Sequence, residues 1–174
     1  DIKDIKGPEL EKFKTSISFK HLRNHLEAAT KEGRVKKVKR FLDKLDKNDR
    51  IRILSIEDRN CVGLTGGEDE DDENFKGLMI NTLYSNKDDS SGGSYGLGKS
   101  VYWRFSGAST VIAVSNLKRV PNSTFDNPRL MGRTKLPTHK IGEETFQGPG
   151  WFGQRKKFES GEERAESIWG KRAV

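Results

Sequence analysis

The chain has 174 residues, of which 32% are hydrophobic and 34% are charged, so we expect one modest core with sizeable solvated loops or tails. No apolar run approaches the roughly 18 residues of a membrane-spanning helix, and no N-terminal stretch has the order of a signal peptide. Cys61 is the only cysteine, which excludes an internal disulfide and favours a cytoplasmic protein.

Charge is unevenly distributed along the chain. The net charge is +7 and the pI is about 9.5, a balance that favours nucleic acid as a partner because cations bind its phosphates. Residues 31–50 are strongly basic, residues 68–73 form an acidic run, and residues 118–174 are basic again. We expect DNA contacts from the segments 31–50 and 118–174, although solvated lysine-rich helix faces would give the same charge.

The first part of the chain is predicted to be helical. Apolar residues recur at roughly helical spacing over residues 8–30, and Pro8 suits the first turn of a helix. Ser16 and Ser18 weaken the middle, which leaves open one long helix or two short ones. Residues 35–45 form an amphipathic stripe with lysines on its outer side.

Strands and loops are expected to alternate with short helices further on. Residues 50–57, "RIRILSIE", predict a strand that is well buried near its end and runs directly into Asp58. Further strands are expected at 109–116 and near 129–136. The other expected elements are a Gly- and acid-rich loop at 60–74, short helices at 75–84 and 99–105, a loop at 147–158, and a helix at 160–170.

A glycine-rich motif, "GGSYGLGKS", occupies residues 92–100. Glycines let backbone N–H groups point at an anion, and a following helix N-terminus adds its positive dipole end. The stretch therefore predicts phosphate binding. Read from Gly93, it matches the P-loop pattern G-x-x-x-x-G-K-[ST]; read from Gly92, it is GG-x-x-G-x-G.

The preceding residues disfavour a P-loop. A P-loop follows a buried strand directly, whereas "YSNKDDSSG" stands before this motif. The apolar strand downstream ends in Asn116 where a P-loop protein has Asp. A flexible Gly-Ser linker is a further alternative, although its glycines and lysine would rarely fall at this spacing.

The order strand, Asp58, glycine turn, helix, loop, GG-x-x-G-x-G, helix and strand resembles the GHKL ATPases. This superfamily includes gyrase B, the ninety-kilodalton heat-shock chaperones, histidine kinases and MutL. The resemblance implies an α+β fold, a two-layer sandwich of the Bergerat type. It also implies ATP and Mg²⁺ as ligands.

A bacterial branch of this superfamily, related to MutL and the MORC ATPases, is more closely similar. That branch accompanies restriction-modification and anti-phage systems. The similar blocks span about residues 51–153 and are "DRNCVGLTG", "GGSYGLGKS", "STVIAVSN", "LMGRTKL" and "GPGWFG". The chain thus predicts an ATP-binding domain over 1–153 with a lid at about 66–92, and a basic extension over 154–174.

The resemblance also implies roles for single residues. Asp58 would accept a hydrogen bond from the adenine amino group in a buried pocket; alternatively, Asp58 only caps a turn. Asn60 and Gly63 would shape the adenine pocket, and the glycine loop with Lys99 would hold the phosphates. The nucleotide-contacting residues implied are Asp58, Asn60, Gly63, Gly92, Gly93, Ser94, Tyr95, Gly96, Leu97, Gly98, Lys99 and Ser100.

The catalytic motif of the superfamily is not found. Its E-x-x-x-N helix supplies the general base and the Mg²⁺ ligand, and Glu9, Glu11 and Glu27 lack an Asn four residues on. We therefore expect a fragment without the first helix, or a protein without a standard base, and assign no catalytic or metal-binding residue. The resemblance nevertheless implies an ATPase.

The resemblance implies a nucleotide-driven switch. Lid closure and homodimerisation would act on DNA or on nuclease or helicase subunits of a defence system. The alternatives are a non-catalytic nucleic-acid or protein-interaction module with a vestigial glycine loop, and a P-loop NTPase.

Other residues carry weaker signals. His21 and His25 stand at i, i+4, a metal-binding spacing, but no third ligand is near in sequence, so we interpret them as helix-surface residues. His139 receives no role. Trp103 and Phe105 are expected in the core, whereas Trp151 and Phe152 could be either core residues or an exposed contact.

Overall fold

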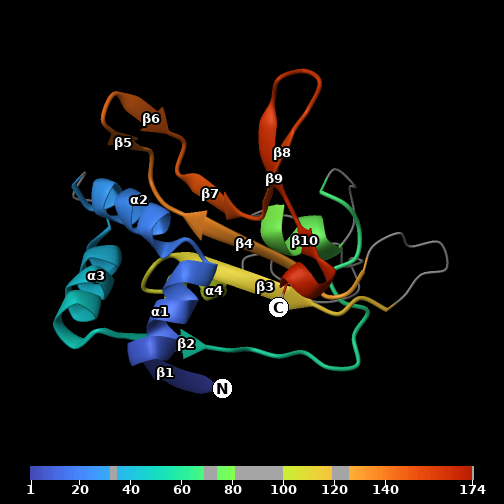
Figure 1. Cartoon of the computed structure of the whole chain (residues 1–174), viewed down its shortest axis with the longest axis horizontal. Coiled ribbons are helices and arrows are strands. Elements are labelled where there is room, and N and C mark those ends of the chain that lie inside the picture. The colour runs from blue at the N-terminus through green and yellow to red at the C-terminus, as the bar shows by residue number, and fades with distance from the viewer. Residues whose placement is uncertain (32–34, 69–73, 81–99, 119–125, 174) are drawn as a thin grey trace, which may run out of the picture. The chain divides into compact units, whose positions relative to one another are not determined.

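The computed structural model describes residues 1–31, 35–68, 74–80, 100–118 and 126–173 (Figure 1). The chain mixes helices with antiparallel strand pairs, which confirms the α+β prediction. It divides into two compact units. Unit 1 comprises residues 1–59, 106–110 and 134–150, and unit 2 comprises 60–105, 111–133 and 151–174. The division into a domain of 1–153 and a separate extension stays a prediction.

Unit 1 contains three helices and two strand pairs. The helices are α1 (Gly7–Ser16), α2 (Phe19–Lys31) and α3 (Lys36–Asn48). The strands are β1 (Ile2–Lys6), paired with β2 (Arg50–Leu54), and β5 (His139–Ile141), paired with β6 (Glu144–Phe146).

The helices form where the apolar spacing predicts them. Pro8 occupies the first turn of α1, where its missing N–H is not needed. Ser18, with φ 48°, separates α1 from α2, so two short helices form rather than one long one. α3 ends at Asn48; the capping residue Asp49 has a left-handed φ of 44°, and its N–H still donates to the Leu45 carbonyl.

The core of unit 1 comes from the inner faces of these helices and of the β1–β2 pair. Its most buried apolar side chains are Ile5, Leu10, Phe19, Leu22, Leu26, Ala29, Val38, Leu42, Leu45 and Ile51. Ile5 and Ile51 are direct partners in the β1–β2 register, so both point inward from the same position.

The expectation that the strand at 50–57 is buried near its end is wrong. β2 stops at Leu54, and Leu54 and Ile56 are 49% and 65% exposed. Only β1 pairs with β2 among the described strands, and two strands alone leave the outward side chains in solvent.

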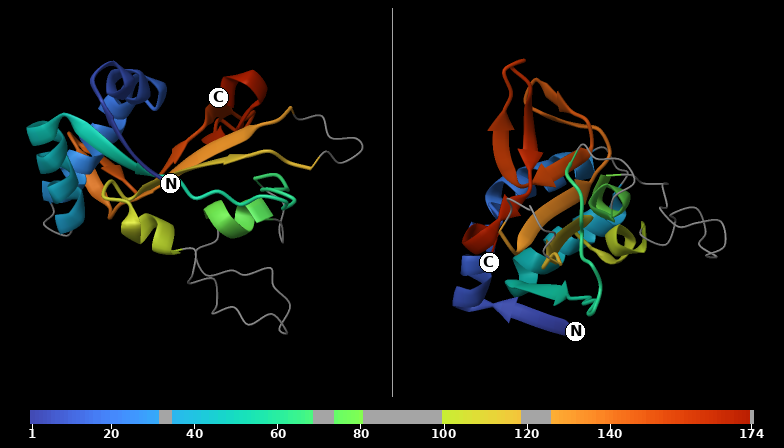
Figure 2. Two further views of the ribbon diagram at one scale, coloured as in Figure 1. Left: turned by 90° about the horizontal axis from the view of Figure 1, so that it is seen from below. Right: turned by 90° about the vertical axis from the view of Figure 1, so that its right-hand side faces the viewer.

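Unit 2 contains most of a four-stranded sheet. Its order is β10–β4–β3, with β7 also pairing with β4; β3 and β4 run side by side in both views of Figure 2. The bounds are β3 (Thr110–Ser115), β4 (Arg129–Lys135), β7 (Pro149–Phe152) and β10 (Ile168–Trp169). A hairpin pairs β8 (Gln154–Lys157) with β9 (Glu163–Glu166). The helical elements are the π-helix η1 (Lys76–Ile80), α4 (Ser100–Phe105) and the 3₁₀ turn η2 (Gly170–Ala173).

Two sequence predictions in this part of the chain are wrong. Residues 147–158, expected to form a loop, carry β7 and β8, and residues 160–170, expected to form a helix, carry β9 and β10. β8 is "QRKK", exposed at every position, so it lacks the apolar alternation that marks a strand. Its pairing with β9 is decided by cross-strand contacts, not by hydrophobic pattern.

Phe75, Met79 and Met131 form the buried apolar cluster of unit 2. Leu64, Leu78, Ile80, Ala113 and Ala165 pack against it. The cluster joins the short helical segment at 74–80 to β4. Within the described residues, no helix is long and apolar enough to cross a membrane.

Candidate functional site

The structure describes four of the twelve residues predicted to contact nucleotide. Asp58 lies exposed in the extended stretch after β2, so the expectation of a buried carboxylate is not met. Asn60 and Gly63 lie in the following turn, and Ser100 begins α4. Gly92, Gly93, Ser94, Tyr95, Gly96, Leu97, Gly98 and Lys99 lie outside the described residues, as does most of the predicted lid.

The turn at residues 60–66 repeats the left-handed backbone conformation three times. Asn60, Gly63 and Gly66 have φ values of 61°, 82° and 84°. Asn tolerates this conformation better than most residues, and Gly adopts it without cost. The spacing of these residues in "DRNCVGLTG" therefore has a conformational reason.

Gly63 is also required by packing. A Cβ atom at this position would lie 2.7 Å from Ser115 Oγ and 3.0 Å from the Asn116 carbonyl oxygen, at the end of β3. The Leu64 N–H donates to Ser115 Oγ at 2.9 Å. The turn thus lies directly against the strand end that follows the glycine-rich motif in sequence.

Arg129 in β4 holds the other side of this turn. Its side chain is 1% exposed, and its guanidinium donates to the carbonyls of Leu64 (2.9 Å) and Gly66 (2.5 Å). The guanidinium carbon stands 3.4 Å from the centre of the Phe75 ring. A buried guanidinium with carbonyl acceptors and an aromatic face fixes the turn to the sheet.

Glu68 completes this cluster. Its carboxylate lies 3.2 Å from the Arg129 guanidinium and accepts hydrogen bonds from the Ser167 N–H (2.8 Å) and hydroxyl (2.6 Å). Burial alone would raise the pKa of Glu68, but the Ser167 hydrogen bonds and Arg129 outweigh it and hold the pKa below its ordinary 4.5. Sequence reasoning placed Glu68 only in an acidic run. No local signal could identify its role, because Ser167 follows it by 99 residues.

Arg133 holds both flanks of the segment that contains the glycine-rich motif. Its side chain, 8% exposed, donates to the carbonyls of Met79 and Ile80, the last described residues before position 81. The backbone carbonyl of Arg133 accepts a hydrogen bond of 2.9 Å from the indole N–H of Trp103, which lies in the helix that begins at Ser100. Ile80 and Trp103 are therefore both held by one residue of β4.

Arg133 is a buried cation without a carboxylate partner in the described part of the chain. Burial lowers its pKa. The guanidinium carbon lies 4.6 Å from the centre of the Trp151 ring, and no described residue accepts a hydrogen bond from Nε. Carbonyl oxygens and an aromatic face are the groups that balance this charge.

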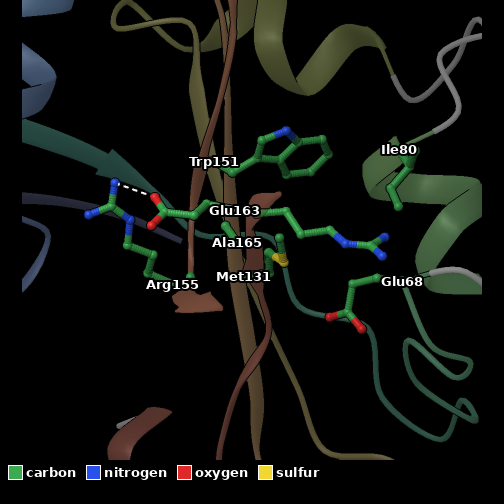
Figure 3. A pocket seen from close by; sticks show the side chains of 9 residues that line it. Glu68, Ile80, Met131, Trp151, Arg155, Glu163 and Ala165 are labelled. Atoms are coloured by element: carbon green, nitrogen blue, oxygen red, sulfur yellow. Dashed lines mark ion pairs between the residues drawn. The ribbon is translucent and has the colours of Figure 1, made fainter. Parts of the chain in front are cut away.

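Unit 2 also holds an open groove of about 650 Å³ (Figure 3). Met131, Ala165 and Ile80 give it an apolar part, and Trp151, 36% exposed, stands beside them. Arg155 and Glu163 form an ion pair of 2.6 Å at one side. Trp151 is thus partly exposed and partly packed.

Two histidines that sequence reasoning left without a role are in contact in unit 1. His25 Nδ1 in α2 lies 2.9 Å from His139 Nε2 in β5, and Phe146 in β6 packs edge-on against His25. Burial, then the neighbouring His139 and His21, lower the pKa of His25. No group of three potential ligands suited to a metal ion occurs among the described side chains, so no Mg²⁺ ligand is assigned.

The aromatic residues of α4 behave differently from each other. Trp103 is 3% exposed, which confirms its expected place in the core. Phe105 is 74% exposed, so its expected core position is wrong. Phe105 is the last residue of the six-residue helix α4, and Ser106 after it is no longer helical.

The comparisons with known proteins give no relative. The chain matches no protein-family model, and no curated protein and no solved structure is significantly similar to it. The functional argument therefore depends on the site itself.

Proposed function

We propose that this chain is an ATP-binding module of the GHKL type. Its nucleotide-driven lid closure and dimerisation would act as a switch in a DNA-linked bacterial anti-phage or restriction system. In this proposal, the α+β chain is a partial Bergerat-type sandwich whose catalytic helix is missing. The observation that supports it best is the left-handed turn Asn60–Gly66, which has glycine where a Cβ would collide with the end of β3.

The order of elements gives further support. The turn follows a strand and Asp58, and α4 and β3 follow the glycine-rich motif, as the resemblance to GHKL ATPases implies. Arg133 anchors the residues on both sides of the segment 81–99. A segment whose two flanks are held in place loses less conformational entropy when it binds a ligand.

Each described residue would have a defined part in nucleotide binding. The Asp58 carboxylate is exposed, so it is accessible to the adenine amino group, from which it would accept a hydrogen bond. Asn60 and Gly63 would shape the turn beside the base. The backbone of residues 92–98, Lys99 and Ser100 would hold the phosphates, with Mg²⁺ neutralising part of their charge.

Two alternatives stay open. The P-loop interpretation depends on a strand directly before Gly93, and this place lies outside the described residues. An interaction module with a vestigial glycine loop predicts DNA or protein binding that is indifferent to nucleotide.

Isothermal calorimetry with ATP and Mg²⁺ tests the proposal. We expect the wild-type chain to bind ATP and the variant Asp58→Ala to lose binding, because the adenine amino group loses its acceptor. Glu143→Ala is the matched control, since this exposed acid lies in the β5–β6 turn. Unchanged ATP affinity in Asp58→Ala would contradict the proposal, and loss of binding in both variants would contradict the role of Asp58.

A further inference from the structure

The outer side of α3 carries five exposed cations that are close together. The helix buries Val38, Leu42 and Leu45 on its inner side. We define the α3 basic face by its outward residues Lys36, Lys39, Arg40, Lys44 and Lys47, all of which are exposed. At about 100° per residue, the five fall within an arc of about 140°, and they extend for roughly 16 Å along the axis.

The acids around this helix do not neutralise the face. Asp46 is held by Arg23 of α2 at 2.7 Å, and Asp49 by Lys14 of α1 at 3.3 Å. Asp43 is the one acid of α3 whose position falls between the five cations. No side-chain hydrogen bond or ion pair is made by any of the five within the described part of the chain.

This arrangement costs the isolated helix stability. Lys36, Arg40 and Lys44 repel one another at i, i+4 spacing. The first turn holds no acid and begins with lysines, where the helix dipole disfavours positive charge. A bound polyanion would relieve both effects.

The chemistry of the face selects among polyanions. Within the described residues, α3 exposes no large apolar side chain. Helices that bind membrane surfaces and the centres of protein interfaces do bury apolar groups, so neither partner suits this face. A phosphate backbone requires only cations. A row of about 16 Å is long enough to reach phosphates on both edges of the roughly 12 Å major groove of DNA.

We propose that the α3 basic face binds the phosphate backbone of double-stranded DNA without reading its base sequence. Lysine and arginine on a helix surface neutralise phosphates and release counterions, so affinity falls steeply with salt. The inference is independent of nucleotide binding at the turn near Gly63.

Fluorescence anisotropy of the whole chain with a labelled 20-base-pair duplex, at several salt concentrations and without ATP, tests the proposal. If the face contributes five contacts, log affinity should fall with log salt with a slope of about −4.5. The variant Lys36→Gln/Arg40→Gln/Lys44→Gln should weaken binding at least about tenfold at low salt and reduce the slope by about 3. Glutamine keeps a similar helix propensity, so circular dichroism should show an unchanged fold.

The matched control removes the same charge elsewhere. Lys6→Gln/Lys12→Gln/Lys20→Gln changes three exposed cations outside the segments 31–50 and 118–174 and should leave the slope nearly unchanged. If both triple variants lose the same DNA affinity, net charge alone explains the loss, and the proposal is overturned. Absence of duplex binding, or binding of anionic phosphatidylserine vesicles in its place, would overturn it too. Equal affinity for duplexes of different sequence supports backbone recognition.

Discussion

Arg129 connects segments that are far apart in sequence. Its guanidinium meets carbonyls of the turn near Gly66, the carboxylate of Glu68 and the hydroxyl of Ser167 in one buried place. If the cation were removed, the Leu64 and Gly66 carbonyls would lose this donor, the Glu68 carboxylate would lose its opposite charge, and the Phe75 ring would lose its contact. Removing only the cation of such a buried cluster is strongly destabilising, because its partner groups stay buried. Replacing the cation and its partners together by apolar side chains is often tolerated.

We therefore expect Arg129→Met to lower the free energy of unfolding by about 3–5 kcal/mol, because the Glu68 carboxylate stays half-buried without its cation. Urea unfolding at pH 7 measures this change. Arg155→Met is the matched control: Arg155 pairs with Glu163, but its side chain is 80% exposed, so the loss should be far smaller. Similar losses in the two variants would show that the Arg129 cluster adds no stability of its own.

At the scale of single elements, the turn Asn60–Gly66 combines two separate requirements. Its residues must adopt left-handed backbone angles, and Gly63 must leave room for the end of β3. The first requirement is local and the second is tertiary. A comparison of two glycines separates them.

Gly63→Ala should destabilise the protein by more than about 1 kcal/mol for two reasons. A φ of 82° is unfavourable for alanine, and the new methyl group collides with Ser115 Oγ. Gly161→Ala has nearly the same φ, 84°, with nothing within 4 Å of the added Cβ. Thermal unfolding of both variants measures the difference. If Gly161→Ala is as damaging as Gly63→Ala, the contact with β3 contributes nothing.

The elements differ in how far sequence could predict them. Helices α2 and α3 have apolar residues at strict helical spacing, so their positions follow from the pattern alone. Both β8 and β9 are short and charged; β8 is exposed throughout, β9 is half-buried at three of its four residues, and their pairing includes the ion pairs Arg155–Glu163 and Lys156–Glu166. Such cross-strand contacts appear only when the chain folds back, so the sequence suggested a loop and a helix in their place.

At the scale of the whole molecule, the two units hold different titrating groups. Unit 1 contains His25, and unit 2 contains Glu68. The fold lowers the pKa of His25 below its ordinary 6.5, so the neutral ring is favoured in the folded state. Its contribution to stability is full above pH 6.5 and is lost as the pH falls from 6.5 through the lowered folded pKa.

Glu68 responds in a lower range. Its folded pKa lies below 4.5, so its contribution is present above pH 4.5 and is lost only as the pH falls through the folded value. Between pH 7 and pH 5.5 we therefore expect unit 1, but not unit 2, to lose stability. Hydrogen exchange of backbone amides at the two pH values, corrected for intrinsic rates, measures each unit separately. In His25→Leu the loss in unit 1 should be smaller; an unchanged loss would exclude the histidine pair as its cause.

The sequence by itself determined where the helices α1 to α4 lie, the strands β3 and β4, and the turn in which glycine and asparagine recur, because these features depend on periodicity and local backbone conformation. It also supplied the resemblance that motivates the ATP proposal. The tertiary structure alone decided the Arg129 and Arg133 contacts, the histidine pair and the strands β8 to β10. Each of these depends on residues that are distant along the chain, and local patterns carry no information about which distant groups will meet.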